Sequence, residues 1–137
     1  MRHLGKDVPF AELPTGIRYR FHLFQDNDGR FTRATSIGDE FTRLAANYIT
    51  CRVTAVNPGE GRLQVAWQLP EVKDYNGDMK RPPDIGRSIL RVNERTRVWK
   101  DDAALKLSDL KSGNVLRLNL TGELPGKPAV CTDLWVQ

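Results

Sequence analysis

The amino-acid sequence predicts a mostly β protein, and two observations support this class. Apolar and polar residues alternate in most segments that contain apolar residues, and a period of two is typical of a half-buried strand. Clusters of Gly, Pro, Asn and Asp separate these segments at short intervals, as turns between strands do. With 137 residues, of which 39% are hydrophobic and 28% charged, the chain has room for one folded domain and part of a second.

A β-hairpin is predicted near the start of the chain, after a lead-in of residues 1–12 that is polar and unpatterned. Residues 17–24 alternate strictly and form its first strand. The sequence Asp-Asn-Asp-Gly at residues 26–29 favours a turn, and residues 30–37 return as the second strand. The apolar face of the first strand consists of Ile17, Tyr19, Phe21 and Leu23.

A short helix is expected to follow the hairpin. Asp39 is suited to cap its first turn, because an aspartate side chain accepts hydrogen bonds from the free N–H groups there. Phe41, Leu44 and Ala45 would then point inward, and Asn47 would end the helix.

Five further strands are expected in the rest of the chain, each with one apolar face. They are residues 48–56, 62–69, 88–93, 114–121 and 129–136. A long polar connection, residues 70–86, joins the second and third of them, and its three prolines exclude a strand interior. Residues 101–110 suit a short amphipathic helix that stops at Gly113, and residues 122–128 form a turn rich in Gly and Pro.

The order β-β-β-α-β-β over residues 48–137 resembles the OB fold, a five-stranded Greek-key barrel. The sequence Leu-Ser-Asp-Leu-Lys-Ser-Gly at residues 107–113 also resembles the start of strand four in many bacterial OB-like domains, several of unknown function. The resemblance implies an OB-like barrel over residues 48–137, preceded by an N-terminal part, residues 1–47, that holds the lead-in, the hairpin and the short helix.

An internal repeat is indicated by shifting the chain by 97 residues, which places residues 11–37 on residues 108–134 without a gap. Six positions are then identical: Leu13/Leu110, Gly16/Gly113, Arg20/Arg117, Leu23/Leu120, Gly29/Gly126 and Thr35/Thr132. We expect the hairpin to be the strand-four and strand-five half of an earlier copy of the barrel, as in a tandem array. A coincidental hairpin bounded by glycines is the alternative.

Half a barrel would leave a strand edge and an apolar face open, which is costly unless they are covered. Either the chain is therefore part of a longer protein, or the hairpin packs on the complete barrel or on another subunit.

The net charge and the spacing of the two cysteines exclude few classes of function. The net charge of +4 comes from 21 basic and 17 acidic residues, a mild excess that fits either a mixed-charge surface or an anionic partner. Cys51 and Cys131 match no zinc or redox spacing and are either buried free thiols or a disulfide. No apolar run is long enough for a membrane helix, so no membrane span is expected.

Catalytic, cofactor and metal sites are not predicted. The two histidines, His3 and His22, form no catalytic or metal-binding pattern with other residues. The Asp-Asn-Asp-Gly turn lacks the spacing of a calcium loop. Asp74, Asp78 and Asp84 could chelate a divalent ion, with nothing further in the sequence to support it.

The connection 70–86 is the strongest candidate for a binding segment, because 17 residues is long for a compact domain and such loops often carry function. It borders the face of strands two and three, the ligand face of OB folds. The candidate ligand-binding residues are Arg62, Gln64, Lys73, Tyr75, Lys80, Arg81, Arg87, Arg91 and Trp99. Alternatively, the connection folds over the barrel as cover or docks a protein.

The sequence thus predicts a non-enzymatic binding or interaction module, a structural part of a larger or tandem-domain assembly, whose partner is a protein or a second copy of the chain. The alternative is single-stranded nucleic-acid binding through the strand two–three face and the 70–86 connection. There, basic side chains would neutralise phosphates and aromatic ones would stack on bases.

Overall fold

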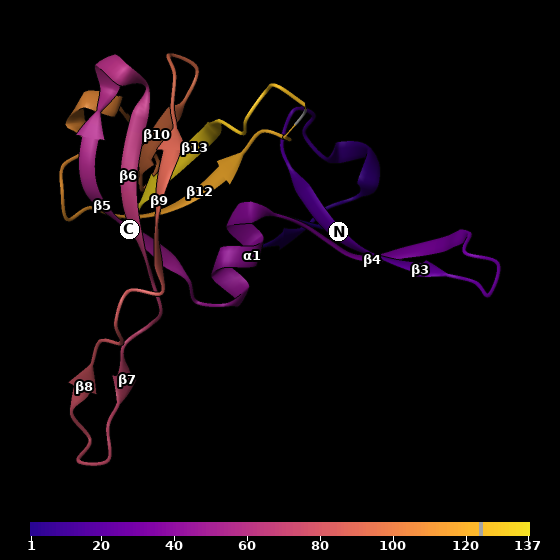
Figure 1. The fold of residues 1–137 in the computed structure, drawn as a ribbon, viewed down its shortest axis with the longest axis horizontal. Coiled ribbons are helices and arrows are strands. Elements are labelled where there is room, and N and C mark those ends of the chain that lie inside the picture. Colours follow the sequence, from indigo (N-terminus) through magenta and orange to yellow (C-terminus); the bar gives the residue numbers. More distant parts are fainter. Residues whose placement is uncertain (124) are drawn as a thin grey trace.

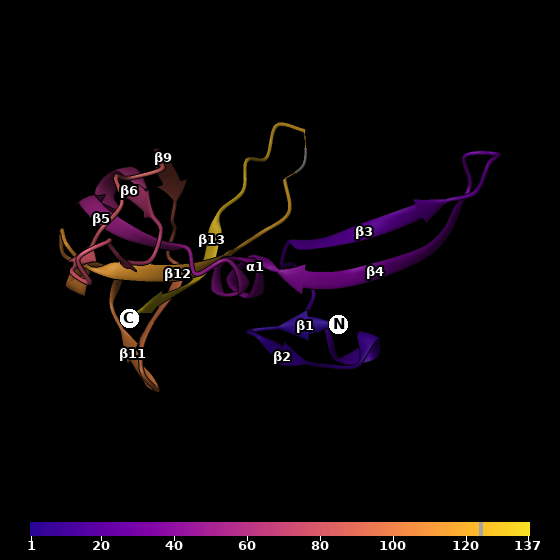
Figure 2. The ribbon, with the colours of Figure 1, turned by 90° about the horizontal axis from the view of Figure 1, so that it is seen from below.

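The computed structural model describes residues 1–123 and 125–137 and is mostly β, with one α-helix in the described part of the chain. Its strands form a four-stranded sheet, a seven-stranded sheet and a separate two-stranded hairpin (Figure 1). The helix lies between the two larger sheets, and the hairpin of the four-stranded sheet extends away from it (Figure 2). The predicted turn at residues 122–128 includes position 124, which lies outside the described residues.

The four-stranded sheet contains the predicted hairpin and has the order β2-β1-β4-β3. Its strands are β1 (Arg2–His3), β2 (Lys6–Asp7), β3 (Tyr19–Gln25) and β4 (Phe31–Asp39). The predicted hairpin is confirmed: β3 and β4 are antiparallel, and the Asp26 side chain accepts hydrogen bonds from the N–H groups of Asp28 and Arg30 in the turn.

The prediction of an unpatterned lead-in over residues 1–12 is wrong. These residues form β1, β2 and a 3-10 turn, Phe10–Glu12, and Arg2 of β1 pairs in parallel with Gly38 of β4. Leu4 and Gly5 turn the chain with φ angles of 51° and 77°. Strands of two residues carry no periodic signal, and their position here depends on β4, which is distant in the sequence.

The predicted short helix is confirmed as α1 (Glu40–Ala46). Asp39 caps it by accepting a 2.8 Å hydrogen bond from the Thr42 N–H, and Asn47 is the C-cap. Leu44 is fully buried and belongs to the core of the seven-stranded sheet.

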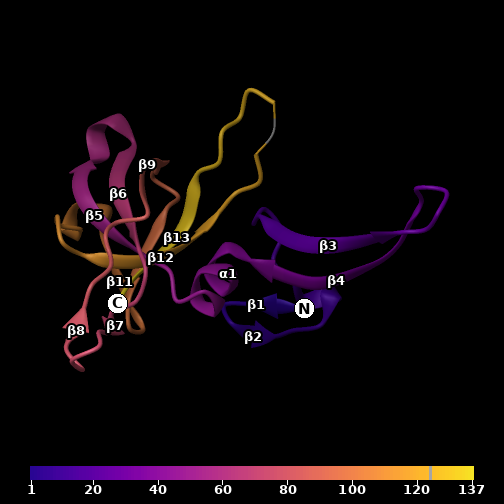
Figure 3. The same cartoon turned by 60° about the horizontal axis from the view of Figure 1, so that its bottom comes forward.

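The seven-stranded sheet has the order β11-β10-β13-β12-β5-β6-β9. Its strands are β5 (Thr50–Asn57), β6 (Arg62–Gln68), β9 (Gly86–Arg91), β10 (Arg97–Lys100), β11 (Ala103–Leu105), β12 (Val115–Leu120) and β13 (Cys131–Val136). A 3-10 turn, Pro58–Glu60, connects β5 to β6. The sheet is curved, but its hydrogen-bonded ladder does not close into a barrel (Figure 3). A single parallel bridge, between Arg91 and Val130, links the end of β9 to the approach to β13.

The core lies on the concave side of this sheet. It consists of the buried side chains of Leu44, Cys51, Val53, Leu63, Val65, Leu90, Val92, Val98, Leu110, Leu116, Leu118, Cys131 and Leu134. Both cysteines are free thiols within it, and burial raises the pKa of Cys51 and of Cys131 from the ordinary 9.0 to about 12.

The helix predicted over residues 101–110 is wrong. The segment forms β11 and a 3-10 turn, Leu107–Asp109, and β11 pairs with β10 in a hairpin that turns at Asp101 with φ of 52°. Leu107 packs against the core and Leu110 is buried, but Ala104 is exposed. A spacing of three between apolar residues also fits a short hairpin followed by a 3-10 turn, so the pattern alone could not separate the two.

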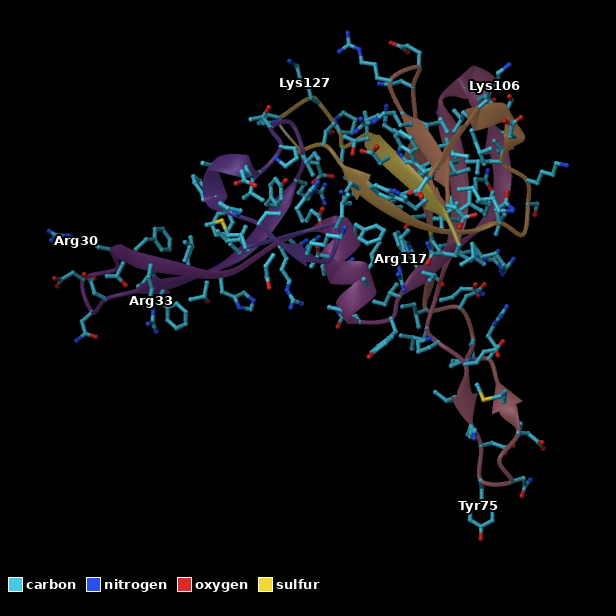
Figure 4. The ribbon with its side chains drawn as sticks, turned by 180° about the vertical axis from the view of Figure 1, so that it is seen from behind. Arg30, Arg33, Tyr75, Lys106, Arg117 and Lys127 are labelled. Carbon is cyan, nitrogen blue, oxygen red and sulfur yellow. The ribbon has the colours of Figure 1, made fainter. Side chains whose placement is uncertain are left out.

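The connection 70–86 forms the separate hairpin, built from β7 (Val72–Lys73) and β8 (Met79–Lys80). It projects away from the seven-stranded sheet rather than folding over it (Figure 1). Tyr75, at its tip, is fully exposed and points outward (Figure 4).

Candidate functional site

Strand pairings in residues 1–39 recur 97 residues later. Arg2 pairs in parallel with Gly38, and Trp99 pairs in parallel with Trp135. The antiparallel pairings recur as well: Arg2–Asp7 as Trp99–Ala104, His3–Lys6 as Lys100–Ala103, Tyr19–Asp39 as Leu116–Val136, Arg20–Gly38 as Arg117–Trp135, and Leu23–Ala34 as Leu120–Cys131. We call residues 1–39 the N-terminal segment and residues 98–136 the C-terminal segment. The antiparallel ladders differ near the bulges, where His22 pairs with Thr35 but Asn119 pairs with Asp133. The parallel pairing is one residue pair long between β1 and β4 and four pairs long between β10 and β13.

Backbone geometry outside the strands recurs at the same spacing. The 3-10 turns Phe10–Glu12 and Leu107–Asp109 are 97 residues apart. The unusual positive φ of Leu4, 51°, has its counterpart in Asp101, at 52°. A non-glycine residue rarely adopts this conformation, so two of them at the same point of equivalent hairpins is a specific similarity.

The two segments differ sharply in the burial of equivalent apolar side chains. Leu118 is fully buried, whereas its equivalent Phe21 is 50% exposed. Val98 is 2% exposed, whereas its equivalent Met1 is 41% exposed. Leu120 packs against the core, whereas Leu23 is exposed. We call the surface formed by Met1, Phe21, Leu23 and Ile37 the open face.

The difference arises from three strands that cover only the C-terminal segment. Val53 of β5 and Leu63 and Val65 of β6 pack in the same core as Leu118, and β5 pairs with β12. β9 completes this three-stranded meander. In the described part of the chain, nothing equivalent lies against the N-terminal segment, and β3 is an edge strand.

A hollow of about 890 Å³ lies along the open face. Met1, Phe21 and Ile37 contribute apolar surface to it, and Thr42 and Ala46 of α1 form part of its rim. Polar and charged side chains, among them Arg20, His22 and Arg43, also line it. Its size and its mixed, partly apolar lining suit a docked protein element better than a small polar ligand.

A buried polar junction holds the two sheets together at α1. The fully buried Asp39 accepts hydrogen bonds from the Leu4 N–H and from the Asn119 side chain, both 3.0 Å, and its carboxylate lies 2.7 Å from His3. Burial acts to raise the pKa of Asp39, but hydrogen bonds from Thr42, Leu4 and Asn119 outweigh it and lower the pKa below its ordinary value. The lowered pKa favours the ionised carboxylate, whose hydrogen bonds link Leu4 of the N-terminal segment to Asn119 of the seven-stranded sheet.

An aromatic contact reinforces the junction. Phe41 of α1 packs edge-on against Trp135 of β13 with ring centroids 4.8 Å apart. The Phe41 N–H donates a 2.8 Å hydrogen bond to the Asn119 side chain. Sequence analysis found the cap at Asp39 but missed His3 and Asn119, because their roles depend on contacts between distant segments.

Four of the predicted ligand-binding residues share one face of β6 and β9. The register places Arg62 opposite Arg91, Gln64 opposite Ile89, and Ala66 opposite Arg87. Residues directly opposite in an antiparallel pair point to the same side, so Arg62, Gln64, Arg87 and Arg91 form one exposed basic face. Ile89, 61% exposed, lies among them.

The other five predicted ligand residues lie elsewhere. Lys73, Tyr75, Lys80 and Arg81 belong to the projecting hairpin and its base. Two of these basic side chains form ion pairs within the hairpin and its base: Lys80 with Asp74 at 2.7 Å and Arg81 with Glu71 at 2.8 Å.

Trp99 is also separate from the basic face. It lies on β10, and its indole N–H donates a 3.0 Å hydrogen bond to Asp133. It lines a hollow of about 200 Å³ with Asn119 and Trp135, near the junction. The structure therefore does not assemble the predicted site as one surface.

No metal centre is formed in the part of the chain that the structure describes, where no three His, Cys, Asp or Glu side chains gather to hold an ion. The proposed set of Asp74, Asp78 and Asp84 is not brought together. Asp84 pairs with Arg52 at 3.2 Å, and Asp74 pairs with Lys80. The hydrogen bond from Lys80 lowers the pKa of Asp74.

Comparisons with family models, curated proteins and solved structures each gave no match. Among the described residues, no helix has both the length and the apolar character needed to cross a membrane.

Proposed function

We propose that the chain is a non-enzymatic interaction module of a tandem-domain assembly. In this proposal, the N-terminal and C-terminal segments are two copies of the second half of one barrel unit that repeats every 97 residues. The observation that carries the proposal is the recurrence of the same strand register at this spacing, in parallel and antiparallel pairs alike.

An OB-like unit fits the strand arrangement of residues 48–137. The order β12-β5-β6-β9 places the fourth strand beside the first and then the second and third, which is the Greek-key order. The OB fold is a partly open barrel of this kind, so an open ladder with one bridge between Arg91 and Val130 is compatible with it.

The open face supports an interaction role. An apolar surface that is buried in one copy and exposed in the other indicates a missing partner, because contiguous exposed apolar patches mark interaction sites. The β3–β4 ladder has its register shift at Phe21, and both Phe21 and Leu23 are nevertheless exposed.

Binding of anilinonaphthalene sulfonate, a fluorescent dye whose aromatic rings bind exposed apolar surface, to the folded chain tests this proposal. The wild-type chain should bind it at neutral pH, and the double substitution Phe21→Ser and Leu23→Ser should remove most of the signal. Phe10→Ser is the matched control, since Phe10 is 70% exposed but lies outside the open face. The proposal is wrong if the folded chain does not bind the dye, or if Phe10→Ser removes as much signal.

A second candidate function is binding of an anionic polymer such as single-stranded nucleic acid on the basic face. Arg62 and Arg91 are directly opposite, and like charges in this position destabilise a sheet. Arg62 lies 3.7 Å from Glu60, whereas no ion pair found among the described residues includes Arg87 or Arg91. A bound phosphate chain would relieve this repulsion.

Fluorescence titration with a generic single-stranded oligonucleotide at two salt concentrations tests the second function. Affinity should fall as salt rises, and Arg91→Ala should weaken it, whereas Arg30→Ala, at the distant tip of the β3–β4 hairpin, should not (Figure 4). Absence of binding at low salt would exclude this function. The basic face carries no aromatic side chain on which bases could stack, so we rank it second.

A further inference from the structure

We infer that the open face is the docking site of a three-stranded antiparallel β-meander of the type formed by β5, β6 and β9. This inference rests on the proposed function and names the partner of the open face by its chemistry. The C-terminal segment shows what such a meander supplies, namely apolar side chains for the core and backbone hydrogen bonds along the strand edge.

The apolar match is the first step. Leu118 is fully buried because Val53, Leu63 and Val65 of the meander share its core. Phe21 is its equivalent by sequence in β3 and is half exposed; it lies at the register shift between Arg20 and His22, whereas Leu118 pairs regularly with Leu134. A sheet that presents alternating Val and Leu side chains would therefore cover the open face as β5 and β6 cover the C-terminal segment.

Backbone hydrogen bonds give the second step. Val53 of β5 accepts a hydrogen bond from the Gly113 N–H and donates one to the Asn114 carbonyl oxygen, both 2.8 Å. The equivalents of these two residues are Gly16 and Ile17. Neither the Gly16 N–H nor the Ile17 carbonyl forms a backbone hydrogen bond within the described part of the chain.

The place for such a strand is open. Gly16 and Ile17 line a hollow of about 390 Å³ together with Asn93 and Arg95 and with residues of the C-terminal segment, among them Thr121 and Val130. The Arg18 N–H donates to the Leu120 carbonyl at 2.7 Å, so the backbone at Arg18 already joins the two segments and is not free to pair with the meander. The meander would attach through the two residues before it.

Chain direction gives the third step. β10 follows β9 after a short turn, and β1 is the equivalent of β10 in the N-terminal segment. The last strand of the docked meander would therefore end close to Met1. A short peptide link to Met1 would be sufficient to connect it.

The experiment adds a copy of the meander to the full chain. Residues 50–97 are duplicated and joined directly to Met1, so that Met1 follows the added Arg97 as Val98 follows Arg97 in the C-terminal segment. Amide hydrogen exchange of β3 should become roughly a hundredfold slower and approach that of β12. Dye fluorescence should fall to the level of the Phe21→Ser, Leu23→Ser variant.

The matched control carries Val53→Asp and Val65→Asp in the added copy alone, which keeps the length and removes the apolar match. It should leave β3 exchange and dye binding as in the parent chain. A second fusion, with Tyr19→Leu and Phe21→Leu, allows for the larger side chains of the open face. If neither fusion protects β3, the inference is wrong.

The oligomeric state shows whether a second copy of the chain, rather than a meander, covers the open face. Light scattering should find the parent chain and both fusions monomeric. A stable dimer of the parent chain that Phe21→Ser dissociates would assign the open face to a second copy and overturn the inference. Dye binding by the parent chain would still support the proposed module when the fusions fail, whereas its absence would contradict both.

Discussion

The N-terminal and C-terminal segments have equivalent ladders and turns but unequal cores. Tyr19 pairs with Asp39 as Leu116 pairs with Val136, yet Leu116 is fully buried and Tyr19 only partly. Backbone register is thus set within each segment by its turns and cross-strand pairs. Burial requires the meander of β5, β6 and β9, which lies against one segment only.

The comparison also explains how the N-terminal segment keeps its shape without a complete core. Its β1–β2 turn is held by α1, since the Leu4 N–H donates to Asp39 and the Gly5 N–H donates to Thr42, both at 3.0 Å. α1 is in turn anchored by Leu44 in the core of the seven-stranded sheet. The polar junction therefore supplies part of the order that hydrophobic packing supplies elsewhere.

Removal of equivalent core side chains should have the most unequal effect. Leu118→Ala should lower the free energy of unfolding by about 2–5 kcal/mol, because it leaves a cavity among buried neighbours. Phe21→Ala should cost less than about 1 kcal/mol, because half of the side chain is already in water. Urea unfolding followed by tryptophan fluorescence measures both, since Trp67, Trp99 and Trp135 all lie in the seven-stranded sheet. Equal losses would show that the open face is buried in solution.

Alkaline pH should weaken only the part of the molecule that contains the buried thiols. Burial raises the pKa of Cys51 and Cys131 to about 12, so their contribution is complete below pH 9 and is lost as pH rises from 9 towards 12. Between pH 8 and 10 the folding equilibrium constant should fall by roughly tenfold for each thiol. In the N-terminal segment, the equivalent of Cys131 is Ala34, and Cys51 has no equivalent. Local opening of β3 should therefore not depend on pH between 8 and 10 in this way.

Urea unfolding at pH 8, 9 and 10 measures this effect. The control is the double variant Cys51→Ala and Cys131→Ala, which retains every other titrating group. The pH-dependent loss should be about a hundredfold smaller in the equilibrium constant of the variant. An equal loss in both proteins would assign the alkaline effect to other residues.

Elements that local chemistry determines are predicted correctly from the sequence, whereas very short strands are not. The hairpin at residues 17–37 and the Asp39 cap follow from alternation, a turn motif and a capping residue. The unpatterned lead-in and the helix at residues 101–110 were wrong in equivalent places, 97 residues apart. In the first place, the two-residue strand β1 pairs in parallel with β4, more than 30 residues away. In the second, the three-residue strand β11 forms a hairpin with β10. Strands this short carry no periodic signal.

The candidate site shows the same division. Arg62, Gln64, Arg87 and Arg91 do share a face, because alternation along regular strands fixes the direction of side chains. Tyr75 could not be placed in this way, since its position depends on the course of a long connection. The open face was expected from the pattern of β3, but the contribution of Met1 was not, because β1 was not recognised.

Substitution of Asn119 in the polar junction, and of its sequence equivalent His22, should give a smaller difference in stability. Asn119→Ala should lower the free energy of unfolding by about 1–3 kcal/mol, because it leaves the partly buried Phe41 N–H without an acceptor and removes a buried hydrogen bond to Asp39. Its equivalent by sequence, His22, is exposed, so His22→Ala should change stability by less than about 0.5 kcal/mol. Thermal unfolding of the two variants makes the comparison. A large loss in His22→Ala would indicate that the outer side of β3 is also in contact with protein.

The smallest effect should come from one pair of equivalent glycines, and it separates local from global stability. Gly16 and Gly113 have φ angles of 78° and 94°, and a Cβ added to either would meet no atom within 4 Å. Alanine at either position therefore has the same cost, about 1–2 kcal/mol for the left-handed backbone.

Gly113→Ala should lower the global stability that tryptophan fluorescence reports, because Gly113 precedes a strand of the core. Gly16→Ala should instead speed hydrogen exchange in β3 roughly tenfold and leave global unfolding unchanged, because an uncovered segment opens before the rest. If both substitutions lower global stability equally, the two segments unfold as one unit, and the polar junction at α1 couples them as strongly as a shared core would.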